Sequence, residues 1–410
     1  MNDPVRTCAS AAASALLLLT SHLSAADWPQ WRGPNRDGVA ASFSVPAQWP
    51  ERLTQRWKIA VGGGHSSPVL AGGRVYLHTR QQEQEVVSAF DAATGRTIWQ
   101  ERYAAPYRMN PAATAHGPGP KSTPVVSAGR VVTLGITGIL SVFESANGKL
   151  LWRKPAPAQP PLYGTATSPA VDGSLVIAHV GGHDSGALTA FDLGTGAEKW
   201  RWAGDGPGYA SPVIGTFGSV RQVITESQDR IVSVSAATGQ LLWELTLRTP
   251  YTQNAVTPVI YRDLLIYSGL EQPLTALRPL RRGAAWSVEK VWENATTGLY
   301  MSSPVLVGST LFGLTNRNRG QFFAVDADSG RTLWTTRGRQ AENAAIVSAG
   351  GLLFLLKDDA ELVVARPSAA SFDPVRGYTV ADSPTWAHPV VDGNRIFIKD
   401  AETLALWTVS

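Results

Sequence analysis

A short apolar strand that usually opens with Ser-Pro or Thr-Pro recurs along this chain, mostly followed by Gly and a second strand. Its prolines are Pro68, Pro124, Pro169, Pro212, Pro258, Pro304 and Pro389. The steps between them run from 43 to 56 residues up to Pro304, and the last gap holds one further copy around Ile346 without a proline. Eight all-β units at a period in the forties indicate a β-propeller, whose function lies in the axial funnel or on the face loops.

Each repeat reads as four short strands. In the first, these are Pro68–Leu70, Arg74–Leu77, Val86–Phe90 and Thr97–Trp99. The last two strands are joined by a turn in which an acid precedes Gly by four residues, where Gly can take the left-handed conformation. The turn recurs as Asp91 to Gly95, Glu144 to Gly148, Asp192 to Gly196 and Asp326 to Gly330, with Ser235 to Gly239 as a copy lacking the acid.

A tryptophan occupies the outer strand of most repeats. The series is Trp57, Trp99, Trp152, Trp200, Trp243, Trp292 and Trp334. At a fixed phase in an outer strand, an indole is expected to pack between blades rather than to stack on a ligand.

The two ends of the repeat region complete each other. The last repeat offers Pro389–Val391, Arg395–Ile398 and Leu404–Trp407 but no fourth strand, whereas Leu53–Ala60 is an outer strand with no repeat of its own. Pairing them removes an open sheet edge. The sequence therefore predicts an all-β fold, an eight-bladed β-propeller of four-stranded antiparallel blades, closed by an N-terminal strand in the last blade.

Three regions follow from this pattern. Residues 1–26 read as a signal peptide, with an apolar stretch at 9–20 and small residues at Ser24 and Ala26 before the expected cleavage site. Residues 27–52 form an N-terminal arm, and residues 53–410 form the propeller. The one cysteine, Cys8, would leave with the signal, so no disulfide or thiolate site is expected. We expect a periplasmic or secreted monomer that neither spans a membrane nor binds nucleic acid.

The Ser/Thr-Pro strand, the acid-x-x-(Thr/Asn)-Gly turn and the following Trp together resemble the repeats of the quinoprotein (PQQ-like) propellers over about residues 53–410. Trp28–Gly38, with the stretches from His116 and Thr385, is similar to exported proteins of PQQ-binding-like repeats. The superfamily includes quinone-dependent alcohol dehydrogenases and the propeller subunit of the outer-membrane β-barrel assembly machinery. The resemblance implies either a non-catalytic scaffold in the cell envelope, binding an envelope protein, or a minimal PQQ-dependent dehydrogenase.

The two alternatives make different chemical demands. A dehydrogenase needs an aromatic face and cations for the quinone, several oxygens for Ca²⁺ and a carboxylate base. Under that alternative Lys121 would contact the quinone, Trp386 would stack on it, and Asn254 or Asn343 would bind Ca²⁺. The mature chain lacks the adjacent cysteines common in such enzymes, and its blades leave little room for their insertions. No cofactor is therefore assigned, and PQQ with Ca²⁺ stays an open alternative.

Residues shortly before the prolines are expected to ring one mouth of the axial channel. They are His65, Lys121, Tyr209, Asn254, Tyr300, Asn343 and Trp386, with His388 close by. Such donors, a cation and aromatic faces suit a small anionic or planar ligand, although a wet funnel mouth also accepts them. No catalytic residue is assigned, because the nearest acids, Glu342 and the more distant Glu226, make no carboxylate pair.

Two further groups of residues are candidates for a site. The N-terminal arm carries Trp28, Trp31, Arg32, Asn35, Arg36 and Asp37 in a segment without a repeat partner, and it is expected to cover one propeller face. Histidines 65, 116, 183 and 388 come from different blades with no metal-ligand spacing, so no metal site is predicted.

Overall fold

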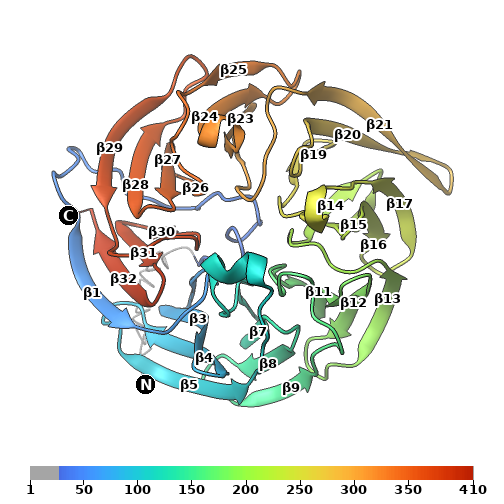
Figure 1. Ribbon diagram of the computed structural model, residues 1–410, viewed down its shortest axis with the longest axis horizontal. Helices are drawn as coiled ribbons and strands as arrows, with labels where there is room; N and C mark the ends of the chain where they lie inside the picture. The colour runs from blue at the N-terminus through green and yellow to red at the C-terminus, as the bar shows by residue number, and fades with distance from the viewer. Residues whose placement is uncertain (1–26, 410) are drawn as a thin grey trace, which may run out of the picture.

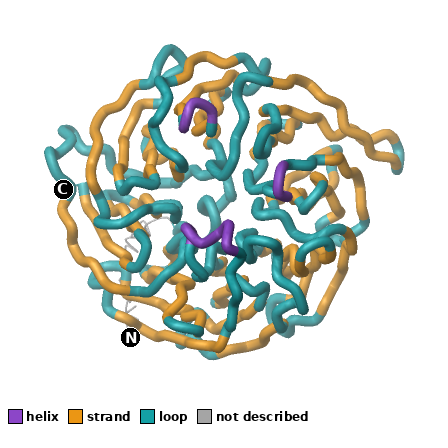
Figure 2. Tube along the Cα trace, in the orientation of Figure 1, coloured by secondary structure: helices purple, strands orange, loops and turns teal. Residues whose placement is uncertain are grey.

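Eight four-stranded antiparallel sheets stand around a central axis in the computed structural model, which describes residues 27–409 (Figure 1). The eight-bladed propeller predicted from the repeats is confirmed. The expected signal peptide lies outside the described residues. Figure 2 shows that strands fill the ring and that loops and short helical turns lie toward its centre.

The first four blades follow the chain without interruption. Blade 1 contains β2 (Val69–Ala71), β3 (Arg74–Gln81), β4 (Gln84–Asp91) and β5 (Thr97–Ala104). Blade 2 contains β6 (Val125–Ser127), β7 (Arg130–Leu134), β8 (Leu140–Glu144) and β9 (Leu150–Lys154). Blade 3 contains β10 (Ala170–Asp172), β11 (Leu175–Gly182), β12 (Ser185–Asp192) and β13 (Glu198–Gly204). Blade 4 contains β14 (Val213–Phe217), β15 (Val220–Glu226), β16 (Arg230–Ser235) and β17 (Leu241–Thr246).

The remaining blades complete the circle. Blade 5 contains β18 (Val259–Tyr261), β19 (Leu264–Tyr267), β20 (Leu274–Arg282) and β21 (Ala285–Asn294). Blade 6 contains β22 (Val305–Val307), β23 (Thr310–Thr315), β24 (Gln321–Asp326) and β25 (Thr332–Thr335). Blade 7 contains β26 (Ala344–Ala349), β27 (Leu352–Lys357), β28 (Glu361–Arg366) and β29 (Asp373–Thr379). Blade 8 contains β30 (Val390–Asp392), β31 (Arg395–Lys399), β32 (Thr403–Thr408) and β1 (Thr54–Ala60).

Helical structure is limited to three short 3-10 turns in the described part of the chain. They are η1 (Pro111–His116), η2 (Pro250–Thr252) and η3 (Arg317–Arg319). Over residues 27–409, no helix has the length and apolar character needed to cross a bilayer.

The N-terminal strand closes the last blade. β1 pairs antiparallel with β32, from Thr54 opposite Thr408 to Ala60 opposite Thr403. The predicted closure is therefore confirmed. A bulge between Gln55 and Trp57 shifts the register of this pairing, because it inserts an extra residue into one strand of the pair.

Hydroxyl groups before the prolines join the innermost strands of neighbouring blades. The backbone N–H of His388 donates to the hydroxyl of Ser67, and the N–H of Ser67 donates to that of Thr123. The same link runs on through Ser168, Ser211, Thr257 and Ser303. At blade 7 the equivalent residue is Ala345, which has no hydroxyl, and Ser302 accepts from Ala344 instead. The Ser/Thr-Pro motif is thus a hydrogen-bonded collar around the axis.

Tryptophans of the outer strands join neighbouring blades at the rim. The Nε1–H of Trp99 donates to the carbonyl of Ser145 in the next blade, and its ring covers Gly148, where a Cβ would lie only 2.6 Å from the indole. Four other tryptophans make the same two contacts, a hydrogen bond to a carbonyl of the next blade and a ring packed on its turn glycine. The pairs of ring and glycine are Trp57 with Gly95, Trp152 with Gly196, Trp200 with Gly239, and Trp292 with Gly330. The predicted packing role of these indoles therefore agrees with their contacts. The turn glycine is required by this packing as well as by its φ of +80° at Gly148.

Candidate binding site at the propeller axis

A cavity of about 230 Å³ opens at one end of the axis, and all eight blades contribute to its wall. In the blades with a proline, the lining residue lies three positions before it. This rule selects His65, Lys121, Ala166, Tyr209, Ala255, Met301 and Trp386, and blade 7 adds Asn343. Tyr163, Gln253 and Tyr300 also line the wall, and η1 contributes Ala112, Ala113 and His116. Figure 1 shows η1 near the centre of the ring.

Six of the eight residues expected at the funnel lie in this wall. They are His65, Lys121, Tyr209, Tyr300, Asn343 and Trp386. Asn254 and His388 do not line the cavity.

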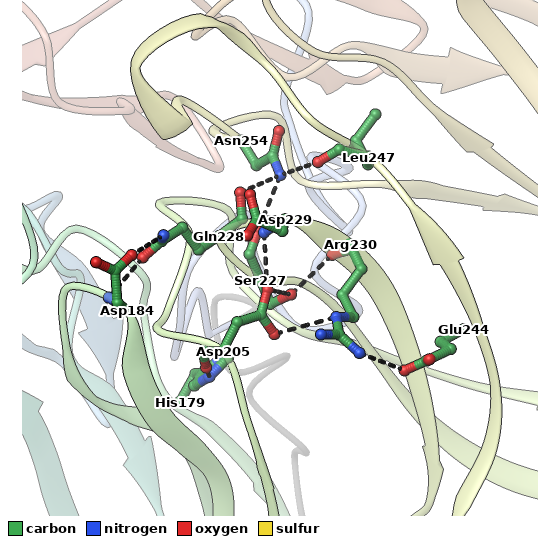
Figure 3. A network of polar contacts seen from close by, with 10 residues as sticks. All are labelled: His179, Asp184, Asp205, Ser227, Gln228, Asp229, Arg230, Glu244, Leu247 and Asn254. Carbon is green, nitrogen blue, oxygen red and sulfur yellow. Dashed lines mark hydrogen bonds and ion pairs between the residues drawn. The ribbon is translucent and has the colours of Figure 1, made fainter.

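Asn254 is a buried structural residue of the loop that joins blade 4 to blade 5. Its amide nitrogen donates to the carbonyls of Ser227, Gln228 and Leu247, as Figure 3 shows. Its side-chain oxygen accepts from the Thr249 hydroxyl at 3.0 Å. Both of its amide hydrogens are used within the protein and the residue is fully buried, so it cannot serve a ligand in the channel.

His388 lies below the cavity, at the level of the hydroxyl collar. Its ring packs edge-on against Trp31 with 4.4 Å between the ring centroids. Burial, together with the charge of Arg32, lowers the pKa of His388 to about 3, so the imidazole is neutral at physiological pH.

Lys121 is the cation of the cavity wall. Its Nζ donates to the carbonyl of Tyr163 at 3.0 Å, and burial lowers its pKa to about 8. The neighbouring His65 has a pKa lowered to about 3, mainly by burial and then by His116, and burial also lowers the pKa of His116. At neutral pH Lys121 therefore carries most of the charge of the wall, while both imidazoles are neutral.

Aromatic side chains surround this cation. Trp386 meets His116 edge-on at 4.7 Å between ring centroids and lies 5.9 Å from His65. On another part of the wall, Tyr163 and Tyr209 lie 5.9 Å apart, and the Tyr209 hydroxyl accepts from the backbone N–H of Tyr163. These contacts fix the rings before any ligand enters.

The N-terminal arm fills the axis beneath the cavity. Its Arg32 is 1% exposed and donates to the carbonyls of Ser303 and Pro304. Arg36 is 6% exposed and donates to the carbonyls of Pro212 and Pro169. Burial lowers the pKa of Arg32 to about 10 and that of Arg36 to about 9, so both remain charged at neutral pH.

The other arm residues fall into three environments. Trp31 forms part of the cavity wall, and its Nε1–H donates to the Thr257 hydroxyl at 3.1 Å. Trp28 is buried and its backbone pairs with that of Leu70. Asp37 is half-buried and accepts from the N–H of Val39, and Asn35 is exposed to solvent. The arm therefore enters the axis itself, beyond the expected covering of a face, and its segment runs to the ring centre in Figure 1.

The acidic residues considered from the sequence lie outside the cavity wall. Glu342 is exposed beside Asn343. Glu226 is fully buried at the end of β15, where burial raises its pKa well above the usual value, and neither of its oxygens has a hydrogen-bond partner among residues 27–409. The same part of the chain contains no cluster of three or more His, Cys, Asp or Glu suited to a metal ion.

The wall does not fit a quinone held with Ca²⁺. Of the two proposed oxygen donors, Asn254 is committed to backbone and Thr249 contacts, and the Asn343 oxygen accepts from Ser302 at 2.7 Å. No carboxylate of the described residues lines the cavity to bind the ion or act as a base. Lys121 alone faces the several carboxylates and carbonyls that such a cofactor presents.

Sequence reasoning missed Tyr163 as a residue of the wall, and it named Trp31 only as an arm residue without placing it at the cavity. Tyr163 comes from the loop before the third innermost strand, outside the proline register that guided the prediction. Trp31 comes from the arm, which has no repeat partner and so no predictable place. A prediction made strictly from the position three residues before each proline would also have included Ala166, Ala255 and Met301 in the wall.

The chain is similar in sequence to known proteins. A family model described as outer membrane protein assembly factor BamB matches residues 51–117 and 82–336. The BamB of Shewanella oneidensis is 24% identical over 304 residues, covering 68% of this chain and 69% of the relative. The serine/threonine-protein kinase AfsK of Streptomyces griseus is 31% identical over 158 residues, but these are only 18% of its length.

Solved structures share the fold at low identity. BamB from Moraxella catarrhalis superposes with a TM-score of 0.63 at 15% identity, covering 87% of this chain and 97% of the other. The quinohemoprotein alcohol dehydrogenase of Comamonas testosteroni gives 0.66 at 15% identity, covering 94% and 80%. A europium-containing methanol dehydrogenase gives 0.68 at 12% identity, covering 93% and 98%. These likenesses establish the propeller fold that binding proteins and enzymes share.

Proposed function

The chain belongs to the family of the outer membrane protein assembly factor BamB, and we propose that it is a non-catalytic binding propeller of the cell envelope. In this proposal it acts as a monomeric scaffold that binds an envelope protein during the assembly of outer-membrane proteins. It would be exported by residues 1–26 and work in the periplasm, with the arm and propeller as its mature parts. The family match over more than half of the chain supports this proposal.

The observation that carries the non-catalytic assignment is the composition of the axial wall. The axis is where a propeller of this superfamily would gather reacting groups. In the described residues, its lining is neutral or cationic, and it includes no acid that could pair as acid and base. The collar and the buried arginines join the innermost strands around the axis, which suits a disc that presents loops to a partner.

A loss-of-function experiment tests the scaffold role. The gene would be deleted in the native host, and the levels of outer-membrane β-barrel proteins would be measured in isolated envelopes. We expect these levels to fall, to be restored by the wild-type gene and by Lys199→Met on the outer strand β13, and not to be restored by a chain lacking residues 53–60. Unchanged β-barrel levels in the deletion strain would contradict the proposal.

A second measurement tests the enzyme alternative, which the structural likeness to dehydrogenases raises. The purified protein would be incubated with PQQ, Ca²⁺, an alcohol or sugar panel and an artificial electron acceptor. We expect no turnover above the protein-free control. Turnover that disappears in Lys121→Met would instead establish a quinone-dependent enzyme.

A further inference from the structure

The axis of this propeller concentrates buried positive charge. Lys121 lies in the cavity wall, Lys399 lies next to His65, and Arg32 and Arg36 fill the axis below. Each of these four side chains bonds to neutral oxygens, nearly all of them backbone carbonyls. None of the four has a carboxylate within ion-pair distance in the described part of the chain.

The acidic groups near these cations are few. Asp37 raises the pKa of Arg32, and Asp400 and Glu402 raise that of Lys399, although burial lowers both values overall. These carboxylates offset part of the charge but do not line the cavity. Buried charges are normally paired, and an unpaired cluster of one sign favours an ion of the opposite sign. The cavity is therefore poised to accept an anion.

Lys121 has hydrogen-bonding capacity to spare. A lysine ammonium carries three donors, and the carbonyl of Tyr163 uses one of them. The remaining N–H groups can bind a carboxylate that enters the cavity, since Lys121 lines the wall and its Nζ lies against Tyr163, another lining residue. A charge-assisted bond of this kind in a partly dry site is stronger than a neutral one.

The rest of the wall selects for a ring. Trp31, Trp386 and the tyrosines at 163, 209 and 300 supply flat faces, and Ala166, Ala255 and Met301 supply apolar surface. A cavity of about 150 Å³ is enough for benzene. The 230 Å³ here holds one ring with a carboxylate and a further small substituent.

We propose that the axial cavity binds a small aromatic monocarboxylate, with its carboxylate on Lys121 and its ring against Trp386 and the tyrosines. The wall carries one cation, Lys121, which matches a ligand with one carboxylate. A quinone with several carboxylates would leave the others without a cation in the wall. The site is independent of the scaffold role, which concerns contacts of the propeller with a partner protein.

Titration calorimetry on the purified chain with its arm intact tests this site. The probes are 4-hydroxybenzoate and 4-hydroxycinnamate, with 4-hydroxybenzamide as the neutral analogue and cyclohexanecarboxylate as the non-aromatic anion. We expect both aromatic carboxylates to bind, and the amide and the cyclohexane compound to bind at least tenfold more weakly. Aromatic carboxylates that do not bind, or an amide that binds equally well, would overturn the proposal.

Two substitutions locate the ligand. Lys121→Met should weaken binding of 4-hydroxybenzoate at least tenfold, whereas Lys199→Met, a half-exposed lysine of β13, should leave it unchanged. Trp386→Leu should reduce the preference for the aromatic acid over cyclohexanecarboxylate. Unchanged affinity in Lys121→Met would overturn the assignment, as would tight binding of PQQ that requires Ca²⁺. If Lys121→Met does not fold, the comparison of acid and amide on the wild-type protein decides.

Discussion

At the scale of single residues, Lys121 sets the charge of the axial cavity because its neighbours are held neutral. Burial keeps the pKa of His65 and His116 below the usual value, and burial raises the pKa of Tyr209 and Tyr300. Between pH 7 and 9 these four side chains therefore stay uncharged. Lys121, with a pKa of about 8, is the lining group expected to change its charge in that range.

This difference predicts how ligand binding depends on pH. The carboxylate binds the charged form of Lys121, so the affinity for 4-hydroxybenzoate should be constant from pH 6.5 to about 7.5 and fall above about pH 8, approaching tenfold per unit. Lys121→Arg keeps its charge and should reduce the fall to the smaller part that comes from Lys399, whose pKa burial also lowers to about 8. Calorimetry from pH 6.5 to above pH 8, at constant ionic strength, measures this pH dependence. A wild-type affinity that does not change with pH would contradict the role of Lys121.

The residue scale also shows where sequence reasoning stops. Asn254 and Tyr300 both stand four positions before a proline, yet Tyr300 lines the cavity and Asn254 bonds to backbone carbonyls of the preceding blade. Their difference depends on which carbonyls lie within reach after folding, and no spacing along the chain records that. Glu226 shows the same limit, since its burial without a partner follows from the packing around β15.

At the scale of elements, the N-terminal arm is part of the structure at the propeller axis. Its two arginines bond to carbonyls at the start of the innermost strands of blades 3, 4 and 6. These carbonyls lie just before the paired residues of the innermost strands, and the guanidinium groups supply hydrogen-bond donors to them. The sequence predicts the arm as an element because the segment has no repeat partner. For the same reason its place in the axis could not be predicted, since there is no second copy to compare.

Arg36 is expected to anchor the arm. Arg36→Met leaves the carbonyls of Pro212 and Pro169 without donors, and it should lower the free energy of unfolding by about 2–3 kcal/mol. Because the ring pairs its strands independently, its circular dichroism spectrum should be unchanged, while limited proteolysis should cut within 27–52 more rapidly. Asn35→Ala, an exposed change in the same arm, is the matched control. Equal cleavage of the two variants would contradict this anchoring role.

At the scale of the whole molecule, the repeat made the fold predictable. A strand, a turn and a Trp at a regular period specify blades, because the same contacts recur at each interface. Blade 5 departs from the pattern: its long β20–β21 hairpin replaces the glycine turn, and Trp243 of the preceding blade donates instead to Gln222 of its own. The count of eight still held, because the unmatched strands at the two ends determine it.

Closure is expected to decide the stability of the ring. Trp57 is half-buried and covers Gly95, so Trp57→Ala should cost about 3 kcal/mol, the low end for a large aromatic. A chain lacking residues 53–60 should expose the edge of β32 and aggregate. Chemical denaturation and light scattering measure the two effects. A soluble, monomeric deletion variant of unchanged stability would show that the ring does not depend on β1.

The pairing of β1 with β32 also orders the events of folding. Every other sheet consists of strands that follow one another directly, so it can form as soon as its own segment is available. β1 is made first, yet its partner is the last strand of the chain. Loop closure over such a separation is slow compared with local pairing. We therefore expect blade 8 to form last, with β1 unpaired until the rest of the ring has assembled.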